Sequence, residues 1–376
     1  MKYNKNRIFF FGAFSFFKSG NLAYAASGSQ LQLEIIKSIK KIFSYDSFTS
    51  FIFEPNKTWP FSSVYIKKNH NSEIFFHTYI NIKYIRELHI LYKRIIQIIL
   101  NKPDYIFIYN ITFLESIIYN VFQKIYKFKV ILFIQDINEN NLLVILLNKL
   151  TFKLASNFDI LIPITNNIID DFNLPKNKCI LFSGGFTEIA LKMQQNCLNN
   201  QSLKLYPKAV FAGRLEKYNG IDKLVDYWIK KNIKYELHIY GSGSYIKELE
   251  KIIHLNPKIR YFGLVSDIDV FNIQSHSTVN ICLRYSIDLN QNYFFPSKIF
   301  NLLSAPGTVL VNNFNNIPIE MLRYCDLLDE DFNNLNEILN RSNDFNFYNY
   351  NKRIDWIKNF ASWEELIKKI KLKLVQ

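Results

Sequence analysis

Cationic and hydroxyl side chains recur directly after apolar runs in the second half of the sequence. Ser297 and Lys298 follow Pro296, where an apolar helix is expected to begin, and Arg214 and Arg284 each follow a strand-like run. Free N–H groups at a helix start, with a cation beside them, favour binding of an anion. These residues therefore predict a phosphate site. An isolated Pro-Ser-Lys sequence is more often only a helix start with a solvated lysine.

The elements that would position these side chains form a regular series from residue 209 onward. Apolar runs at 209–213, 235–241, 259–263 and 277–283 each lead into a polar turn and a helical pattern, and a further run covers 308–311. Such alternation predicts a parallel sheet, whose ligands lie at the carboxyl ends of the strands. That edge is expected to gather Arg214, Lys217, Gly241, Gly243, Gly263, Arg284 and Lys298. A cationic, glycine-lined pocket of this kind suits a doubly charged phosphate ligand.

The first half of the sequence repeats the same alternation. Apolar runs are found at 8–11, 48–53, 105–110, 130–134, 159–164 and 179–182, with helical patterns at 30–43 and 84–100 between them. We expect a second doubly wound parallel sheet. A loop around Gly28, the residue Asp136 and the pair Gly184-Gly185 lie after predicted strands and are candidate ligand contacts. Each is also consistent with an ordinary turn or helix cap.

Charge limits the choice of partners. The formal net charge is +14, but the lysines are dispersed and no nucleic-acid motif is present, so we expect no nucleic-acid partner. Small anionic substrates and an anionic membrane surface remain. The pattern at 84–100 carries Arg86, Lys93 and Arg94 among apolar residues. It is consistent with a helix on a membrane surface or with a packed helix whose basic face meets solvent.

Cysteine usage and hydropathy bear on the compartment. The four cysteines are widely spaced and form no CxxC pair, which favours a reduced, cytoplasmic location, with peripheral attachment to the inner face of the cell membrane as an option. The apolar run at 8–17 follows a basic start, and we interpret it as a buried strand rather than a signal peptide. No later segment reaches about 18 uncharged apolar residues, so a spanning helix is not expected.

Four segments resemble the group 1 glycosyltransferases in order and spacing. They read AGRLEKYNGIDKL (212–224), LHIYGSGSYIKEL (237–249), IRYFGLV (259–265) and FFPSKIFNLLSAPGTVLV (294–311). This resemblance implies a retaining enzyme of the GT-B fold, with two Rossmann-like doubly wound domains facing across a cleft, that uses a nucleotide-diphosphate sugar. It divides the chain into an acceptor-side domain at 1–192, a linker at 193–207, a donor-binding domain at 208–345, and a C-terminal helix at 346–376 that crosses back to the first domain.

Site residues follow from the resemblance position by position. Arg214 and Lys298 would hold the donor diphosphate and form the catalytic pair, and Lys217 is a further cation. The nucleotide-sugar contacts would be Gly28, Lys217, Gly241, Gly243, Gly263, Leu264, Val265, Arg284, Ser297 and Asn301. Asp136 would contact the acceptor or the sugar. Two glutamates usual in the family are replaced here by Tyr293 and Asn301.

The implied chemistry uses fixed cations to stabilise the leaving diphosphate, so no metal or other cofactor is expected. Two DxD pairs, Asp267/Asp269 and Asp329/Asp331, are interpreted as helix or turn residues. The expected partners are a nucleotide-sugar donor and a glycan or lipid-linked glycan acceptor, as in surface polysaccharide biosynthesis. The replacement at Asn301 leaves an alternative open, an inactive GT-B protein that binds a nucleotide sugar or a membrane. An epimerase with the same fold ranks last.

Overall fold

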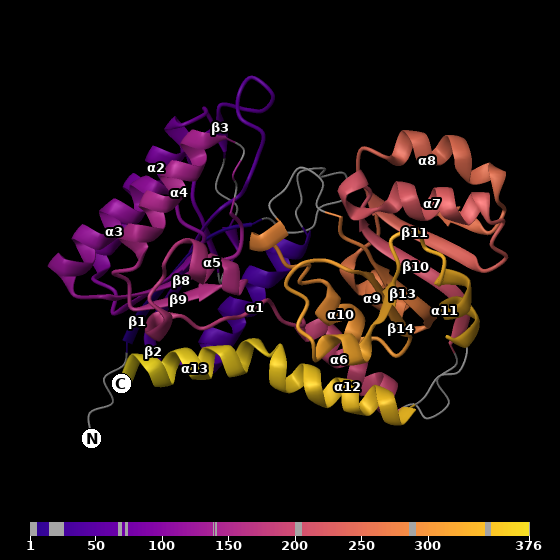
Figure 1. The fold of residues 1–376 in the computed structure, drawn as a ribbon. Helices are drawn as coiled ribbons and strands as arrows, with labels where there is room; N and C mark the ends of the chain where they lie inside the picture. Colours follow the sequence, from indigo (N-terminus) through magenta and orange to yellow (C-terminus); the bar gives the residue numbers. More distant parts are fainter. Residues whose placement is uncertain are drawn as a thin grey trace. The chain divides into compact units, whose positions relative to one another are not determined.

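The computed structural model of the chain describes residues 6–14, 26–66, 70–71, 74–137, 139, 141–199, 205–285, 291–342 and 347–375. The chain forms two compact units. Unit 1 comprises Met1–Ser183 and Trp363–Gln376, and unit 2 comprises Gly184–Ser362. The fold is shown in Figure 1, and each unit is described by itself.

Unit 1 is built on a sheet with the strand order β4-β5-β2-β1-β7-β8-β9. All neighbouring strands are parallel except β4 and β5. Its strands are β1 (Asn6–Ala13), β2 (Tyr45–Phe53), β4 (His70–Asn71), β5 (Ile74–Phe76), β7 (Tyr105–Tyr109), β8 (Lys129–Ile134) and β9 (Ile160–Pro163), and β3 (Tyr65–Ile66) pairs separately with β6 (Tyr79–Ile80). Its helices are α1 (Ala26–Ile42), α2 (Ile85–Asn101), α3 (Phe113–Tyr126), α4 (Leu142–Ala155), α5 (Asn166–Asp171), α13 (Trp363–Val375) and the 3₁₀ turn Lys176–Lys178.

Alternation along the central strand explains why both faces of this sheet are covered. Ile8 and Phe10 are fully buried in a cluster with side chains of α1 and α13. Phe11 points to the opposite face, where its ring stacks on Tyr119 of α3 at 5.8 Å between centroids. Neighbouring side chains of a strand point to opposite faces, so a continuous apolar run fits a sheet with helices on both sides.

Unit 2 is built on a fully parallel sheet with the strand order β12-β11-β10-β13-β14-β15. Its strands are β10 (Tyr206–Arg214), β11 (Glu236–Ser242), β12 (Ile259–Tyr261), β13 (Ser277–Cys282), β14 (Thr308–Asn312) and β15 (Asp326–Leu328). Its helices are α6 (Glu188–Asn199), α7 (Ile221–Lys230), α8 (Ile246–Ile252), α9 (Asp267–Ser275), α10 (Ile299–Ser304), α11 (Leu335–Arg341) and α12 (Phe347–Phe360). The 3₁₀ turns are Lys217–Asn219, Ile253–Leu255, Gln291–Tyr293 and Met321–Tyr324.

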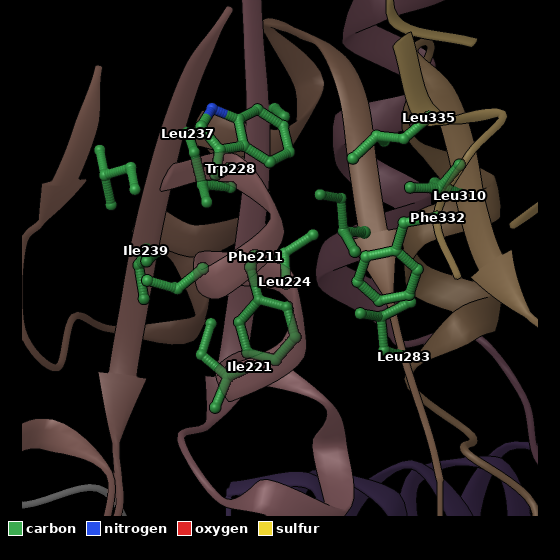
Figure 2. Close-up of a cluster of buried hydrophobic side chains, with 14 of the residues drawn as sticks. Phe211, Ile221, Leu224, Trp228, Leu237, Ile239, Leu283, Leu310, Phe332 and Leu335 are labelled. Carbon is green, nitrogen blue, oxygen red and sulfur yellow. The ribbon is translucent and has the colours of Figure 1, made fainter. Parts of the chain in front are cut away.

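The core of unit 2 contains one large aromatic side chain from α7 and another from the sheet. Trp228 of α7 and Phe211 of β10 are both fully buried, and Figure 2 shows them among aliphatic side chains from β11, β14 and α11. The indole nitrogen of Trp228 donates a hydrogen bond to the carbonyl of Tyr235 at 2.9 Å. Buried polar atoms normally need a hydrogen-bond partner, and this bond satisfies the one polar atom of the side chain. Trp228 can therefore fill the core without leaving an unpaired N–H group.

The architecture confirms the predicted class of two doubly wound parallel sheets, and β1 confirms that the run at 8–11 is a strand. Three local predictions are wrong. Residues 179–182 form no strand, only a single bridge from Cys179 to Leu161. Gly28 lies inside α1 rather than in a loop. Part of the expected linker is helical, since α6 runs to Asn199.

The expected C-terminal helix is two helices, α12 in unit 2 and α13 in unit 1, where α13 packs on α1. In the part of the chain that the structure describes, no helix has both the length and the apolarity needed to cross a bilayer.

Candidate functional site

The carboxyl ends of β10, β11 and β12 meet at one edge of the unit 2 sheet. Gly213 pairs with Gly241 and Arg214 with Ser242 in the parallel register of β10 and β11. The N–H of Gly241 donates to the carbonyl of Gly263 at 2.8 Å, which adds the end of β12. The edge therefore brings together the predicted glycines and Arg214.

Close backbone packing explains two of these glycines. A Cβ at Gly241, whose φ is +128°, would lie 1.8 Å from the carbonyl oxygen of Gly213, and one at Gly243 would lie 2.3 Å from that of Leu215. Neither position leaves room for a side chain, with or without a ligand. Gly263 differs, because its φ is +75° and a Cβ there would have no atom within 4 Å. Its conformation requires glycine while its surroundings are open.

Lys298 reaches this edge from the segment before α10. Its Nζ lies 3.5 Å from the carbonyl oxygen of Ala212 and 5.3 Å from the ring centre of Phe211. A Cβ at Gly213 would lie 2.9 Å from that Nζ, so glycine at the strand end makes room for the ammonium group. Sequence reasoning missed Gly213, although a glycine directly before Arg214 at a strand end is a usable signal.

The sequence predicts a helix N-terminus at Pro296 with free N–H groups, but the segment before α10 does not form one. The helix begins at Ile299, three residues after Pro296, and has only six residues. The N–H groups of Ser297, Ile299 and Phe300 donate to the carbonyls of Phe295, Pro296 and Ser297 at 2.9–3.2 Å. These N–H groups are therefore occupied, and the cation of Lys298 is the main attraction for an anion.

The Arg284 guanidinium is held behind the edge by neutral groups. Its central carbon lies 3.8 Å from the ring centre of Phe294 and 4.6 Å from that of Tyr218, and it donates to Oδ1 of Asn219 at 3.1 Å. Burial lowers the pKa of Arg284 below its ordinary value. Asn219 also donates to the carbonyl of Arg214 at 2.8 Å, so one amide connects the two arginine segments.

Additional polar groups fix the loops around these cations. Asn312 accepts a hydrogen bond from the N–H of Arg284 at 2.6 Å and donates to its carbonyl at 2.7 Å. Glu216 accepts from the N–H and the hydroxyl of Ser244 at 3.1 and 2.5 Å, which ties the loop after β10 to the loop after β11. Tyr218, Asn312 and Glu216 were not predicted, since their roles depend on contacts between distant segments.

Two of the predicted cations are open to a ligand. Arg214 and Lys217 are exposed. No carboxylate in the described parts of the chain forms an ion pair with Arg214, Lys217 or Lys298. Leu264 and Val265 follow Gly263 in the open loop after β12, and Leu264 is exposed. The edge therefore has positive charge that the described residues leave uncompensated.

Asn301 has a structural contact that its sequence position did not reveal. Its Oδ1 accepts a hydrogen bond from the N–H of Thr187 at 3.0 Å, directly before α6 begins. Close by, a Cβ at Gly184, whose φ is +120°, would lie 2.7 Å from Cβ of Ser297. The Asn301 oxygen, predicted to contact the nucleotide sugar, is thus bonded to the backbone before α6, while the Thr187 hydroxyl caps the helix by accepting from the N–H of Ala190 at 3.3 Å.

Unit 1 places its candidates at separate positions within its own sheet and helices. Asp136 follows β8, and its carboxylate accepts from Asn110, the residue after β7, at 3.1 Å. Desolvation raises the pKa of the Asp136 carboxyl although part of the side chain is exposed, and the Asn110 amide opposes this shift. Gly28 lies in the first turn of α1, where its carbonyl accepts from Gln32 at 3.3 Å. Neither contact by itself accounts for the residue type at these two positions.

The DxD pairs lie in α9 and in the turn after β15, as predicted. Ser266, the N-cap of α9, accepts from the N–H of Asp269 and donates to its carboxylate. Asp329 accepts from the N–H groups of Asn333 and Asn334. Among the residues that the structure describes, no group of three or more His, Cys, Asp and Glu side chains is arranged to hold a metal ion.

Comparison with protein-family models and with curated proteins gives no match. Solved structures, in contrast, match over nearly the whole chain. HepE from Anabaena, solved with UDP, aligns with a TM-score of 0.63 at 12% identity and covers 98% of this chain and 99% of its own. Sucrose-phosphate synthase from Thermosynechococcus elongatus aligns with a TM-score of 0.66 at 12% identity, over 98% and 99% of the two chains.

A third structure, the lipopolysaccharide outer core galactosyltransferase WaaB, aligns with a TM-score of 0.60 at 14% identity and covers 97% of this chain and 99% of its own. At such identities the likeness concerns the arrangement of the backbone. The alignments extend over both units of this chain, which contain two successive, mainly parallel α/β sheets and a final helix that packs on the first. The chain therefore has the GT-B fold of the glycosyltransferases.

Proposed function

We propose that the protein is a glycosyltransferase that moves a sugar from a nucleotide-diphosphate sugar to a glycan or lipid-linked glycan. The observation that carries this proposal is the convergence of Arg214 and Lys298 at the strand edge of unit 2, where no carboxylate of the described residues neutralises them. A diphosphate supplies the missing negative charge. The structure of HepE holding UDP-glucose, with the same fold, makes a nucleotide sugar the natural donor.

In the proposed reaction, the bond between the sugar and the diphosphate breaks while negative charge develops on the leaving oxygen. Lys298 is anchored beside β10 and Arg284 is fixed between two rings, so both charges are in place before the donor arrives. Preorganised cations stabilise developing charge without reorganisation during the reaction. We assign the diphosphate to Arg214, Lys298 and Lys217, and the acceptor side to Asp136, with retention of configuration.

The test combines donor binding with donor turnover. A thermal-shift screen against nucleoside diphosphates and their sugars first identifies the base, because a bound ligand raises the melting temperature by mass action. Lys298→Ala and Arg214→Ala are then expected to lower donor hydrolysis and transfer about 100-fold or more, by analogy with loss of one oxyanion donor. Lys251→Ala, an exposed lysine of α8, is the matched control and should retain wild-type turnover. Wild-type-like turnover by Lys298→Ala would refute the assignment.

A second candidate follows from Asn301, whose oxygen accepts from the N–H of Thr187 instead of being held free for a ligand. In this case the protein binds a nucleotide sugar without transferring it, as a partner subunit. Calorimetry would then show nucleotide-diphosphate binding that Arg214→Ala weakens, with neither hydrolysis nor transfer for any acceptor. Measurable hydrolysis by the wild-type protein decides in favour of the enzyme.

A further inference from the structure

Two neighbouring helices of unit 1 expose an unusual number of aliphatic side chains. Four lie on α3 and four on α4: Leu114, Ile117, Val121, Ile125, Leu142, Leu143, Leu146 and Leu150. We call these eight residues the α3–α4 face. The side-chain amide of Asn120 on α3 donates to the carbonyl of Leu154 on α4 at 2.9 Å, so the two helices pack directly together. Figure 1 shows them side by side on unit 1.

The core of unit 1 does not require these side chains. On α4 only Thr151, Phe152 and Ala155 are buried, whereas Leu142 is 84% exposed and Leu143 is 65% exposed. A helix that exposes leucines on its outer side is not the usual surface helix, which is polar there. Contiguous apolar patches of this kind mark sites of interaction with a protein or a membrane.

The charges around the face select between those partners. The one acid on α3, Glu115, is buried and bonded to Arg94 at 2.6 Å, and α4 contains no acid. The exposed charges on and directly after these helices are all positive: Lys124, Lys127, Lys149 and Lys153. A second copy of the chain would bring lysines against lysines, which is unfavourable at an interface. An anionic lipid surface complements both the leucines and the lysines.

The neighbouring helix α2 does not provide this contact in the way that its sequence suggested. Arg94 is bonded to Glu115, Lys93 donates to Thr78 at 2.6–2.7 Å, and Arg86 donates to Glu87 and to the carbonyl of Asn56. Its basic groups are therefore bound to the protein itself. Helix α2 also exposes aliphatic side chains, such as Leu88 and Leu100, but none of its own basic side chains is exposed. On α3 and α4, exposed lysines accompany the exposed aliphatic groups.

We propose that the α3–α4 face inserts its aliphatic side chains into the interfacial layer of an anionic bilayer, while its lysines bind lipid headgroups. Both helices start just after strands whose ends carry Asn110 and Asp136. Docking would therefore hold the carboxyl edge of the unit 1 sheet near the lipid surface. This last step rests on the proposed glycosyl transfer: an active edge held near the lipid surface favours an acceptor that is anchored to a lipid.

The test is cosedimentation of the full chain with vesicles. Vesicles of phosphatidylcholine with about one-third phosphatidylglycerol are expected to bind the protein at least tenfold more tightly than phosphatidylcholine alone. The variant Leu142→Ser/Leu143→Ser/Leu146→Ser should lose at least tenfold in affinity for the anionic vesicles. A matched control, Leu255→Ser/Ile268→Ser/Ile319→Ser, removes three exposed aliphatic side chains of unit 2 and should bind like the wild type.

Other outcomes would overturn the proposal. Unchanged binding by the α4 triple variant would place the lipid contact elsewhere. Complete loss of wild-type binding in about 0.5 M salt would mean that charge alone is responsible, because apolar insertion is not screened. A concentration-dependent dimer in sedimentation velocity that the triple variant abolishes would assign the face to a second copy. Vesicle binding needs no donor, and the triple variant should bind nucleotide diphosphate normally, so failure here is distinct from failure of the proposed reaction.

Discussion

The guanidinium of Arg284 is the most enclosed cation at the edge of the unit 2 sheet. Two aromatic faces and the Asn219 amide hold the guanidinium, and the side-chain amide of Asn312 holds the Arg284 backbone. A charge held in this way needs no rearrangement when an anion binds. Lysine could supply the same charge, but not a plane that stacks on two rings.

We therefore predict that Arg284→Lys lowers the free energy of unfolding by about 1–3 kcal/mol, because Asn219 loses a well-placed donor and the rings lose their stacking partner. Urea denaturation measures the change. The control is Arg260→Lys. Arg260 forms an exposed ion pair with Glu236 at 3.6 Å, so this substitution should change the free energy of unfolding by less than about 0.5 kcal/mol. Equal effects of the two substitutions would contradict the enclosed role of Arg284.

Asp136 offers a prediction about pH. Desolvation raises its pKa above the ordinary 3.8, so the folded state favours the protonated carboxyl. Stability linked to this group is fully present below the unfolded pKa and is lost as pH rises through the folded pKa. Asp136→Asn removes that dependence. We expect the variant to gain stability relative to wild type as pH rises from about 4 to 7, measured as urea midpoints. A wild-type protein that becomes relatively more stable over this range would contradict the prediction.

At the scale of elements, α12 is tied to the end of α10 by one buried arginine. Arg353 donates to the carbonyls of Gly307 and Pro306 at 3.1 Å and also to that of Ala305. Tyr350, one turn earlier, donates to the carbonyl of Ser304 at 3.0 Å. Carbonyls at the end of a helix lack partners within it, so Tyr350 satisfies the last carbonyl of α10. Arg353 satisfies the carbonyls of the turn that follows the helix.

Arg353→Met should lower the free energy of unfolding by about 2–4 kcal/mol, since buried carbonyls lose charged donors. Tyr350→Phe, which removes one neutral hydrogen bond at the same junction, should cost about 1 kcal/mol. Chemical denaturation of the two variants provides the comparison. An Arg353→Met variant as stable as the wild type would show that desolvation of the guanidinium cancels its hydrogen bonds.

Elements that depend on local pattern were predictable, and those that depend on distant contacts were not. The apolar runs at 8–11 and 130–134 are strands because a buried parallel sheet needs continuous apolar sequence. The polar sequence after 193 hid the end of α6. The residue before this helix, Thr187, is held by Asn301, more than 100 residues later in the chain. The same limit applies at the site, where Arg214 and Lys298 were predictable but Tyr218 and Asn312 were not.

At the scale of the molecule, unit 1 draws its core from both ends of the sequence. Trp363, Leu366, Ile367 and Ile370 of α13 are buried in one cluster with Ile35 and other residues of α1. The ring of Trp363 packs on Phe182 with centroids 4.7 Å apart. Unit 2 lies between these two parts in the sequence and has a separate core around Trp228.

Removal of residues 363–376 should therefore destabilise unit 1 selectively. Four buried apolar side chains at about 1.5–3 kcal/mol each approach the whole stability of a typical domain. Hydrogen exchange read by mass spectrometry should show faster exchange in β1, β7 and β8 and little change in β10 and β13. Lys369→Ala, an exposed residue of α13, is the control and should leave both patterns unchanged. Faster exchange confined to unit 2 would contradict the assignment of α13.

The place of α13 in unit 1 also sets an order of events during synthesis. Domains usually fold as their chain emerges from the ribosome, with the first one completed first. Here unit 2 has all its residues before unit 1 does, because α13 is translated after Ser362. The apolar surface of α1 that α13 covers stays open while all of unit 2 is being made. The half of the protein that is translated first is thus completed last.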